Sequence, residues 1–134
     1  MDTNAVIYYL GAVEPYFERM TELFSRAEAG ELSLVLPVIV EAELVVGPLR
    51  SGDEAAVETI RTFLESFPNL SIVPIDRSAA QRASGLRARH GLGMADALLA
   101  AVAIEAGCDA IVGNDHRCAQ RLTEIEYVLL GVGT

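Results

Sequence analysis

Four acidic residues are the side chains in this sequence best suited to act together: Asp2, Glu43, Asp96 and Asp115. If the fold gathers them, their mutual repulsion pushes some of them toward the protonated form. A divalent cation removes that conflict, and an all-oxygen ligand set suits Mg²⁺ or Mn²⁺ rather than zinc. Such a site activates water and hydrolyses phosphodiesters. It also reverses the local charge, so an acidic protein can still bind nucleic acid there.

Each of these acids also has an ordinary structural explanation when it is taken alone. Asp2 is of a helix-capping type and precedes a short apolar run that predicts a first helix. Asp96 falls in the first turn of a predicted helix, where the helix dipole favours negative charge. Asp115 comes at the end of a predicted strand segment, where turn residues are common. Glu41 and Glu43 lie about 200° apart on a helix, so at most one of them faces a shared site.

The elements that position these residues alternate between helix and strand. Apolar periodicity predicts helices over 13–27, 38–47, 53–67, 76–91, 93–107 and 116–122, and strands over 31–37, 70–75, 109–115 and 126–130. Gly47-Pro48 and Gly91 are predicted helix stops, and Ser78 is a capping type near the start of another helix. The helix over 93–107 is apolar nearly all round, so it should be buried.

The strands are continuous apolar runs, which is typical of a parallel sheet covered by helices on both faces. We therefore predict one domain over residues 1–134, with a three-layer α/β/α fold and a central, mostly parallel sheet. Ligands of such sheets bind beyond the carboxyl ends of the strands. The predicted elements place all four acids at that edge.

The composition restricts the class of protein. Hydrophobic residues make up 51% of the 134 residues, yet no apolar run reaches the about 18 residues of a membrane span. No secretory signal is readable, so we expect a cytoplasmic protein that does not enter a membrane. The net charge of −9 argues against simple electrostatic binding of nucleic acid. Cys108 and Cys118 lie in no zinc-binding pattern and are expected to be ordinary thiols.

Four segments together resemble PIN domains, and within them the VapC-type toxin ribonucleases. The segments are "DTNAVIYYL", "EAELVVGPLR", "RARHGLGMADALLAAVAIEAG" and "DAIVGND", and their order and separation fit along essentially the whole chain. Each segment is weak evidence alone, and the four in register are specific.

The resemblance implies a PIN-like fold and endonucleolytic cleavage of RNA with Mg²⁺ or Mn²⁺. It implies that the metal site consists of Asp2, Glu43, Asp96 and Asp115, and that Thr3 and Asn114 support the ligands or orient the substrate. Within that set, Asp2 and Asp96 match the most direct ligands, and the match selects Glu43 over Glu41. Proteins of this type usually form homodimers and are inhibited by a small antitoxin whose tail enters the acidic groove.

The sequence departs from the family pattern at two places. Gly113 stands two residues before the last acid, where the family usually carries the hydroxyl of Thr or Ser. Only Met1 precedes Asp2, whereas the family's first acid ends a buried strand. The first strand thus looks truncated, and a ligand needs rigid support. We therefore expect Asp2 to be poorly held and the metal site to be weak or empty.

Three other interpretations stay open from the sequence. The two departures are compatible with a PIN-like binding or regulatory module without effective catalysis. A phosphoacceptor domain of receiver type would need a lysine near the carboxylates, and the chain has none. A basic segment precedes Asp96, and it is either a solvated helix face or a phosphate-binding rim for RNA. Its members are Arg77, Arg82, Arg87, Arg89 and His90.

Overall fold

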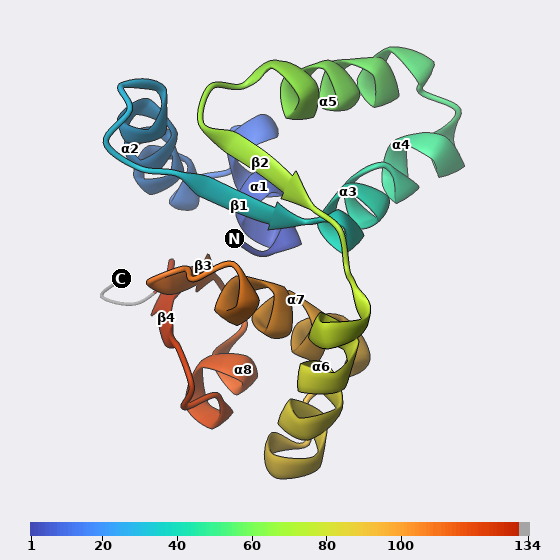
Figure 1. Ribbon diagram of the computed structural model, residues 1–134. Coiled ribbons are helices and arrows are strands. Elements are labelled where there is room, and N and C mark those ends of the chain that lie inside the picture. Colours follow the sequence, from blue (N-terminus) through green and yellow to red (C-terminus); the bar gives the residue numbers. More distant parts are fainter. Residues whose placement is uncertain (132–134) are drawn as a thin grey trace.

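The computed structural model describes residues 1–131 and shows helices and strands alternating along the chain (Figure 1). The helices are α1 (Thr3–Leu10), α2 (Tyr16–Glu28), α3 (Val38–Leu44), α4 (Val46–Ser51), α5 (Glu54–Ser66), α6 (Arg77–His90), α7 (Met94–Glu105) and α8 (His116–Arg121). The strands are β1 (Leu34–Pro37), β2 (Leu70–Val73), β3 (Ala110–Gly113) and β4 (Glu126–Leu129). Residues 132–134, which the predicted domain includes, lie outside the described residues.

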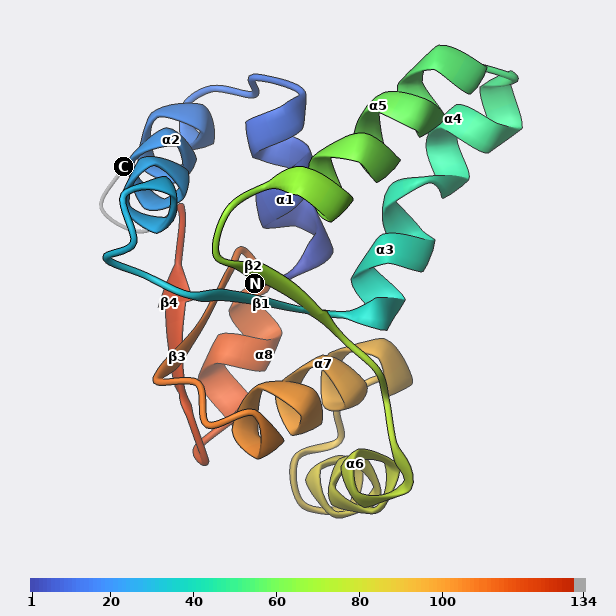
Figure 2. The same ribbon diagram turned by 45° about the horizontal axis from the view of Figure 1, so that its top comes forward.

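The strands form two parallel pairs. β1 pairs with β2, with Leu34 opposite Leu70, and β3 pairs with β4, with Ala110 opposite Glu126. The helices α1, α2, α3 and α5 lie on one side of the β1–β2 pair, and α6, α7 and α8 lie on the other (Figures 1 and 2). The predicted α/β/α fold with parallel strands is confirmed, although its centre is two strand pairs rather than one continuous sheet.

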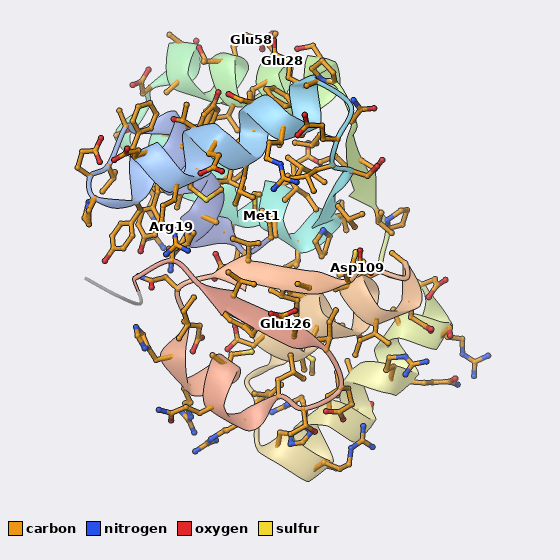
Figure 3. The ribbon with its side chains drawn as sticks, turned by 90° about the vertical axis from the view of Figure 1, so that its left-hand side faces the viewer. Met1, Arg19, Glu28, Glu58, Asp109 and Glu126 are labelled. Carbon is orange, nitrogen blue, oxygen red and sulfur yellow. The ribbon has the colours of Figure 1, made fainter. Side chains whose placement is uncertain are left out.

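Met1 and Asp2 connect the two strand pairs. The amino group of Met1 donates a hydrogen bond to the Val35 carbonyl of β1 at 3.3 Å. The Asp2 N–H donates to the Val112 carbonyl of β3 at 2.9 Å. Met1 is only 8% exposed and lies in the interior of the molecule (Figure 3), where burial lowers the pKa of its amino group. A groove of about 440 Å³ adjoins Met1 and is lined by both Val35 and Val112.

Most predicted elements are present, with ends that differ by up to three residues. Gly91 ends α6 with a left-handed φ of 65°, as predicted. Asp76, not Ser78, caps the start of that helix, because its carboxylate accepts the Ala79 N–H at 2.8 Å. The predicted stop at Gly47-Pro48 is also wrong, since both residues lie in α4. The first turn of a helix leaves its N–H groups without intrahelical partners, so proline is tolerated there.

The helix α7 is the central helix of the core and carries Asp96 in its first turn. One face packs on α6 and another on the strands β1 and β3. Its small side chains are buried nearly all round: Ala97, Leu99, Ala100, Ala101, Val102 and Ala103. A second group of core side chains is aromatic, with Phe24 of α2 stacked on Tyr9 of α1 at a centroid distance of 4.1 Å. These buried contacts fix the elements from which the four acids project.

Candidate functional site

The four acids line one pocket of about 260 Å³. Asp2 immediately precedes α1, Glu43 lies on α3, Asp96 begins α7, and Asp115 follows β3. The fold therefore brings together the four carboxylates that the sequence singled out. The remaining residues of the pocket lining are Thr3, Asn4, Ala95 and Leu99.

Asp2 is held by donors on both sides of its carboxylate. Its Oδ1 accepts the Ala5 N–H at 2.9 Å and so caps α1. Its Oδ2 accepts the Asn114 N–H at 3.2 Å and the Tyr127 hydroxyl at 3.1 Å. The expectation that Asp2 is poorly held is therefore wrong. Asp2 is supported by the Asn114 N–H after β3 and by the Tyr127 hydroxyl of β4 rather than by a preceding strand.

Asp96 and Asp115 are both half-buried members of the pocket lining. Asp115 caps α8, since its Oδ1 accepts the Cys118 N–H at 2.9 Å. Burial raises the pKa of Asp96 to about 6, and the charge of Asp115 and a side-chain hydrogen bond with it act in the same direction. The charges of Asp2 and Glu43 raise that pKa further. The site is therefore a group of carboxylates whose repulsion is not balanced by a positive side chain.

Thr3 and Asn114 turn out to have different surroundings. The Thr3 hydroxyl donates to Glu43 Oε1 at 2.7 Å, so it supports one of the four acids. The Asn114 side chain points elsewhere, because its amide donates to the Tyr8 hydroxyl at 3.3 Å and its Oδ1 accepts the Gly131 N–H at 3.2 Å. Only the backbone N–H of Asn114 therefore serves the acids, through its hydrogen bond to Asp2.

Sequence reasoning missed three residues beside the acids. Asn4 lines the pocket, and the Tyr127 hydroxyl contacts both Asp2 and the Asp115 N–H, the latter at 3.1 Å. Burial and the charge of Asp2 raise the pKa of Tyr127, so this hydroxyl stays protonated. Cys118 is buried as well, and its pKa is raised to about 12 by burial, then by the charges of the nearby acids. The one signal for Tyr127 was Gly113, since a strand glycine often marks a close approach of other atoms.

The donor set fits a hard divalent cation chemically. Four carboxylates supply oxygen ligands alone, and no arginine or histidine lines the pocket to compete with a metal. Burial raises the pKa of Asp96, and the negative charges of Asp115, Asp2 and Glu43 add to that rise. Among residues 1–131, no three acidic, histidine or cysteine side chains stand close enough to hold an ion as placed. Within residues 1–131 the pocket therefore has the donor chemistry that suits a hard cation, but its side chains do not form a closed set of ligands.

Three members of the basic segment before Asp96 contact acids outside the pocket. Arg82 lies 3.2 Å from Glu105, and Arg89 lies 2.8 Å from Glu124. His90 Nε2 lies 2.7 Å from Glu124 as well. These contacts agree with the interpretation of this segment as a solvated helix face with local ion pairs.

Comparisons with known proteins identify the family. The family model of the PIN domain matches residues 1–124. The chain belongs to the PIN domain family. A search of curated proteins gave no match. None of the helices within residues 1–131 is long and apolar enough to span a membrane.

Two solved structures share this PIN fold. A toxin–antitoxin complex from Klebsiella pneumoniae contains a chain with a TM-score of 0.70 and 19% identity, covering 96% of this chain and 94% of that one. VapBC2 from Rickettsia felis, bound to a DNA fragment from its promoter, contains a chain with a TM-score of 0.75 and 21% identity. There the match covers 96% of this chain and 95% of that one. At this identity the likeness shows the fold.

Proposed function

We propose that this PIN domain is a Mg²⁺- or Mn²⁺-dependent endoribonuclease and the toxin of a VapC-type toxin–antitoxin pair. The observation that carries the proposal is the convergence of four carboxylates in one pocket without a positive side chain among them. Most proteins avoid such an arrangement because unpaired carboxylates near one another are costly. A bound cation makes it favourable, which explains why the fold maintains it.

The residues of the pocket have distinct parts in this proposal. Asp2 and Asp96 are the most direct ligands, and Glu43 and Asp115 complete the acidic set. A divalent cation bound there would activate water and stabilise charge on the scissile phosphate. Asp2 and Asp115 are oriented by the helices that they cap, and Glu43 is oriented by Thr3. Asp96 would gain from a cation, because burial and the charges of the neighbouring acids disfavour its charged form.

The same pocket also supports the proposal of a protein partner. Both similar structures are described as toxin–antitoxin assemblies, and the acidic pocket complements a basic side chain. We propose that a small antitoxin inhibits the enzyme by placing an arginine among the carboxylates, where charge-assisted hydrogen bonds are strong. We also propose that the toxin is a homodimer and acts on RNA in the cytoplasm.

The decisive experiment is an RNA cleavage assay of the wild type and Asp96→Asn. We expect cleavage by the wild type in Mg²⁺ or Mn²⁺, and its loss in EDTA and in the variant. Glu124→Gln is the matched control, because it removes a carboxylate charge outside the pocket and should leave cleavage unchanged. Cleavage that survives both EDTA and Asp96→Asn would contradict the proposal.

A second candidate is a PIN-like module that binds a partner without effective catalysis. It is favoured by one observation, which is that the acids within residues 1–131 are not yet grouped closely enough to hold a metal. Calorimetry separates the two candidates. The enzyme should bind Mn²⁺ in the absence of RNA, whereas the binding module should give no heat with Mn²⁺ and still bind its protein partner.

A further inference from the structure

We propose that Tyr127 is a positioning residue for the acidic site and that Gly113 provides the space in which it acts. This inference rests on the proposed metal-dependent function. The Tyr127 hydroxyl donates to Asp2 Oδ2 and accepts the Asp115 N–H, each at 3.1 Å. A single hydroxyl therefore joins the first and the last acid of the set, which are 113 positions apart in the chain.

The pairing of β3 with β4 explains how a tyrosine reaches these acids. Tyr127 lies opposite Ile111, and Leu129 lies opposite Gly113. Tyr127 is therefore a diagonal neighbour of Gly113 on the same face of the strand pair, within reach of a long aromatic side chain. The ring extends past Gly113 to the end of β3, where Asp2 and Asp115 lie.

Gly113 is essential to this arrangement because of what its missing side chain would displace. A Cβ atom at this position would overlap the Asp2 carboxylate and the Tyr127 hydroxyl. Gly113 is itself buried, and Asp2 and Tyr127 are half-buried, so a side chain at this position would have to displace both groups. Any other residue would separate Asp2 from Tyr127. Gly113 lacks the hydroxyl that Thr or Ser would carry at this position. The Tyr127 hydroxyl of β4 occupies the space beside it.

The consequence for the site is a fixed Asp2 and a fixed loop after β3. The Tyr127 hydroxyl is a neutral donor, so it orients Asp2 without cancelling the negative charge that a cation requires. It also holds the backbone of Asp115 through its N–H. Partners that orient metal ligands typically change metal affinity by about 10- to 100-fold when they are removed.

Two measurements on Tyr127→Phe test this inference. In the metal-free protein, NMR hydrogen exchange should show faster exchange of the Asp115 N–H, with the amides within β3 still protected. By calorimetry, the affinity for Mn²⁺ should fall about tenfold or more. Gly113→Ala should accelerate exchange at Asp115 in the same way, because it displaces Asp2 and Tyr127 together.

Two matched controls separate positioning from general loss of structure. Tyr9→Phe removes a hydroxyl from a ring that packs on Phe24, away from the acids, and should leave both measurements at wild-type values. Gly47→Ala adds a methyl group into open space and should do the same.

The outcomes also separate this inference from the proposed function. Unchanged Asp115 exchange in Tyr127→Phe, or Mn²⁺ affinity within twofold of the wild type, would overturn the positioning role. If the wild type bound no Mn²⁺, the proposed function would fail. The exchange measurement, which needs no metal, would then decide the role of Tyr127 by itself.

Discussion

The acidic pocket and the single carboxylate of Glu124 differ in what balances their charge. Glu124 accepts hydrogen bonds from Arg89 at 2.8 and 3.1 Å and lies 2.7 Å from His90. Burial opposes ionisation of Glu124, but the hydrogen bonds from Arg89, His90 and Thr123 prevail and lower its pKa to about 2. Burial raises the pKa of Asp96 to about 6, and the charges of the neighbouring carboxylates act in the same direction. Around Glu124 the positive charge belongs to the chain, whereas the lining of the acidic pocket contains no positive side chain.

The neutral contacts of the acidic pocket sharpen this difference. Asp2 and Asp115 accept hydrogen bonds from backbone N–H groups and, for Asp2, from a protonated tyrosine. Such donors orient a carboxylate and leave its charge in place. Glu124 therefore belongs to a surface ion-pair cluster in which Arg89 and His90 balance its charge. The carboxylates of the pocket are oriented by neutral donors and keep their negative charge, which suits a cation.

The largest effect is expected from removing one charge of the pocket. Asp96→Asn should lower metal-dependent RNA cleavage by about a hundredfold or more, since a direct ligand contributes at least as much as the groups that orient it. Removing the charge of Glu124 should leave cleavage unchanged. Initial cleavage rates of Asp96→Asn and Glu124→Gln at saturating Mg²⁺ test this contrast. Equal rates in the two variants would remove the distinction between the two groups.

The next largest effect is a loss of stability when a side chain is added at Gly113, beside Asp2 and Tyr127. Gly113→Ala should destabilise the protein by about 1–3 kcal/mol, because the added methyl group overlaps Asp2 and Tyr127. Gly47→Ala should be neutral or slightly stabilising, since its methyl group meets open space inside a helix. Urea unfolding of both variants measures the difference. A wild-type midpoint for Gly113→Ala would show that Asp2 is not confined as described.

A smaller effect is expected in the dependence of stability on pH. Folding raises the pKa of Asp96 from 3.8 to about 6, so the folded chain holds the proton more tightly than the unfolded chain does. The contribution of Asp96 to stability is therefore complete below pH 3.8 and declines as the pH rises to about 6. At pH 7.5, metal-free Asp96→Asn should melt about 4 °C above the wild type, which corresponds to about 1 kcal/mol after solvent screening.

Thermal melts of the metal-free proteins from pH 4 to 8 provide this measurement. The two curves should converge toward pH 4, where Asp96 is largely protonated in both the folded and the unfolded chain. A wild type that is as stable as Asp96→Asn throughout the range would show that burial and the neighbouring charges do not disfavour the ionised form of Asp96.

The smallest effect is expected at the ion-pair cluster. Glu124→Gln should change stability at pH 7 by about 1 kcal/mol or less, because ion pairs at the surface contribute little. The sign of its pH dependence is opposite to that of Asp96. Folding lowers the pKa of Glu124 from 4.5 to about 2, so its stabilisation is present above pH 4.5 and is lost as the pH falls toward 2. Acid unfolding of Glu124→Gln and of the wild type measures the two stabilities. A large loss of stability in the variant at pH 7 would contradict the weak contribution of this ion pair.

The sequence was sufficient for the features that depend on local pattern. The all-round apolar segment around Asp96 predicted the buried helix α7, and Gly91 marked the end of α6. Parallel strands followed by helices placed Asp2, Glu43 and Asp115 at one edge, and they line one pocket with Asp96. These inferences succeeded because hydrophobic periodicity and sheet geometry act over short distances or follow simple rules.

The features that were missed depend on contacts between distant segments. Tyr127 reaches Asp2 only because β4 pairs with β3 in one particular register, which no local pattern specifies. Asp2 is held firmly because Met1 and Asp2 bond to β1 and β3, so two residues are enough to fix it. Pro48 lies within a helix because α3 ends at Leu44 and the first turn of a new helix, α4, begins at Val46. Tertiary packing decides each of these cases.

The most direct test of the central claim is a calorimetric titration of Mn²⁺ into the metal-free wild type, Asp96→Asn and Glu124→Gln at pH 7.5. The claim is that the acidic pocket lacks its positive charge until a divalent cation binds. We predict saturable binding to the wild type and to Glu124→Gln, and none to Asp96→Asn. Absence of binding to the wild type, or equal binding to all three proteins, would contradict it.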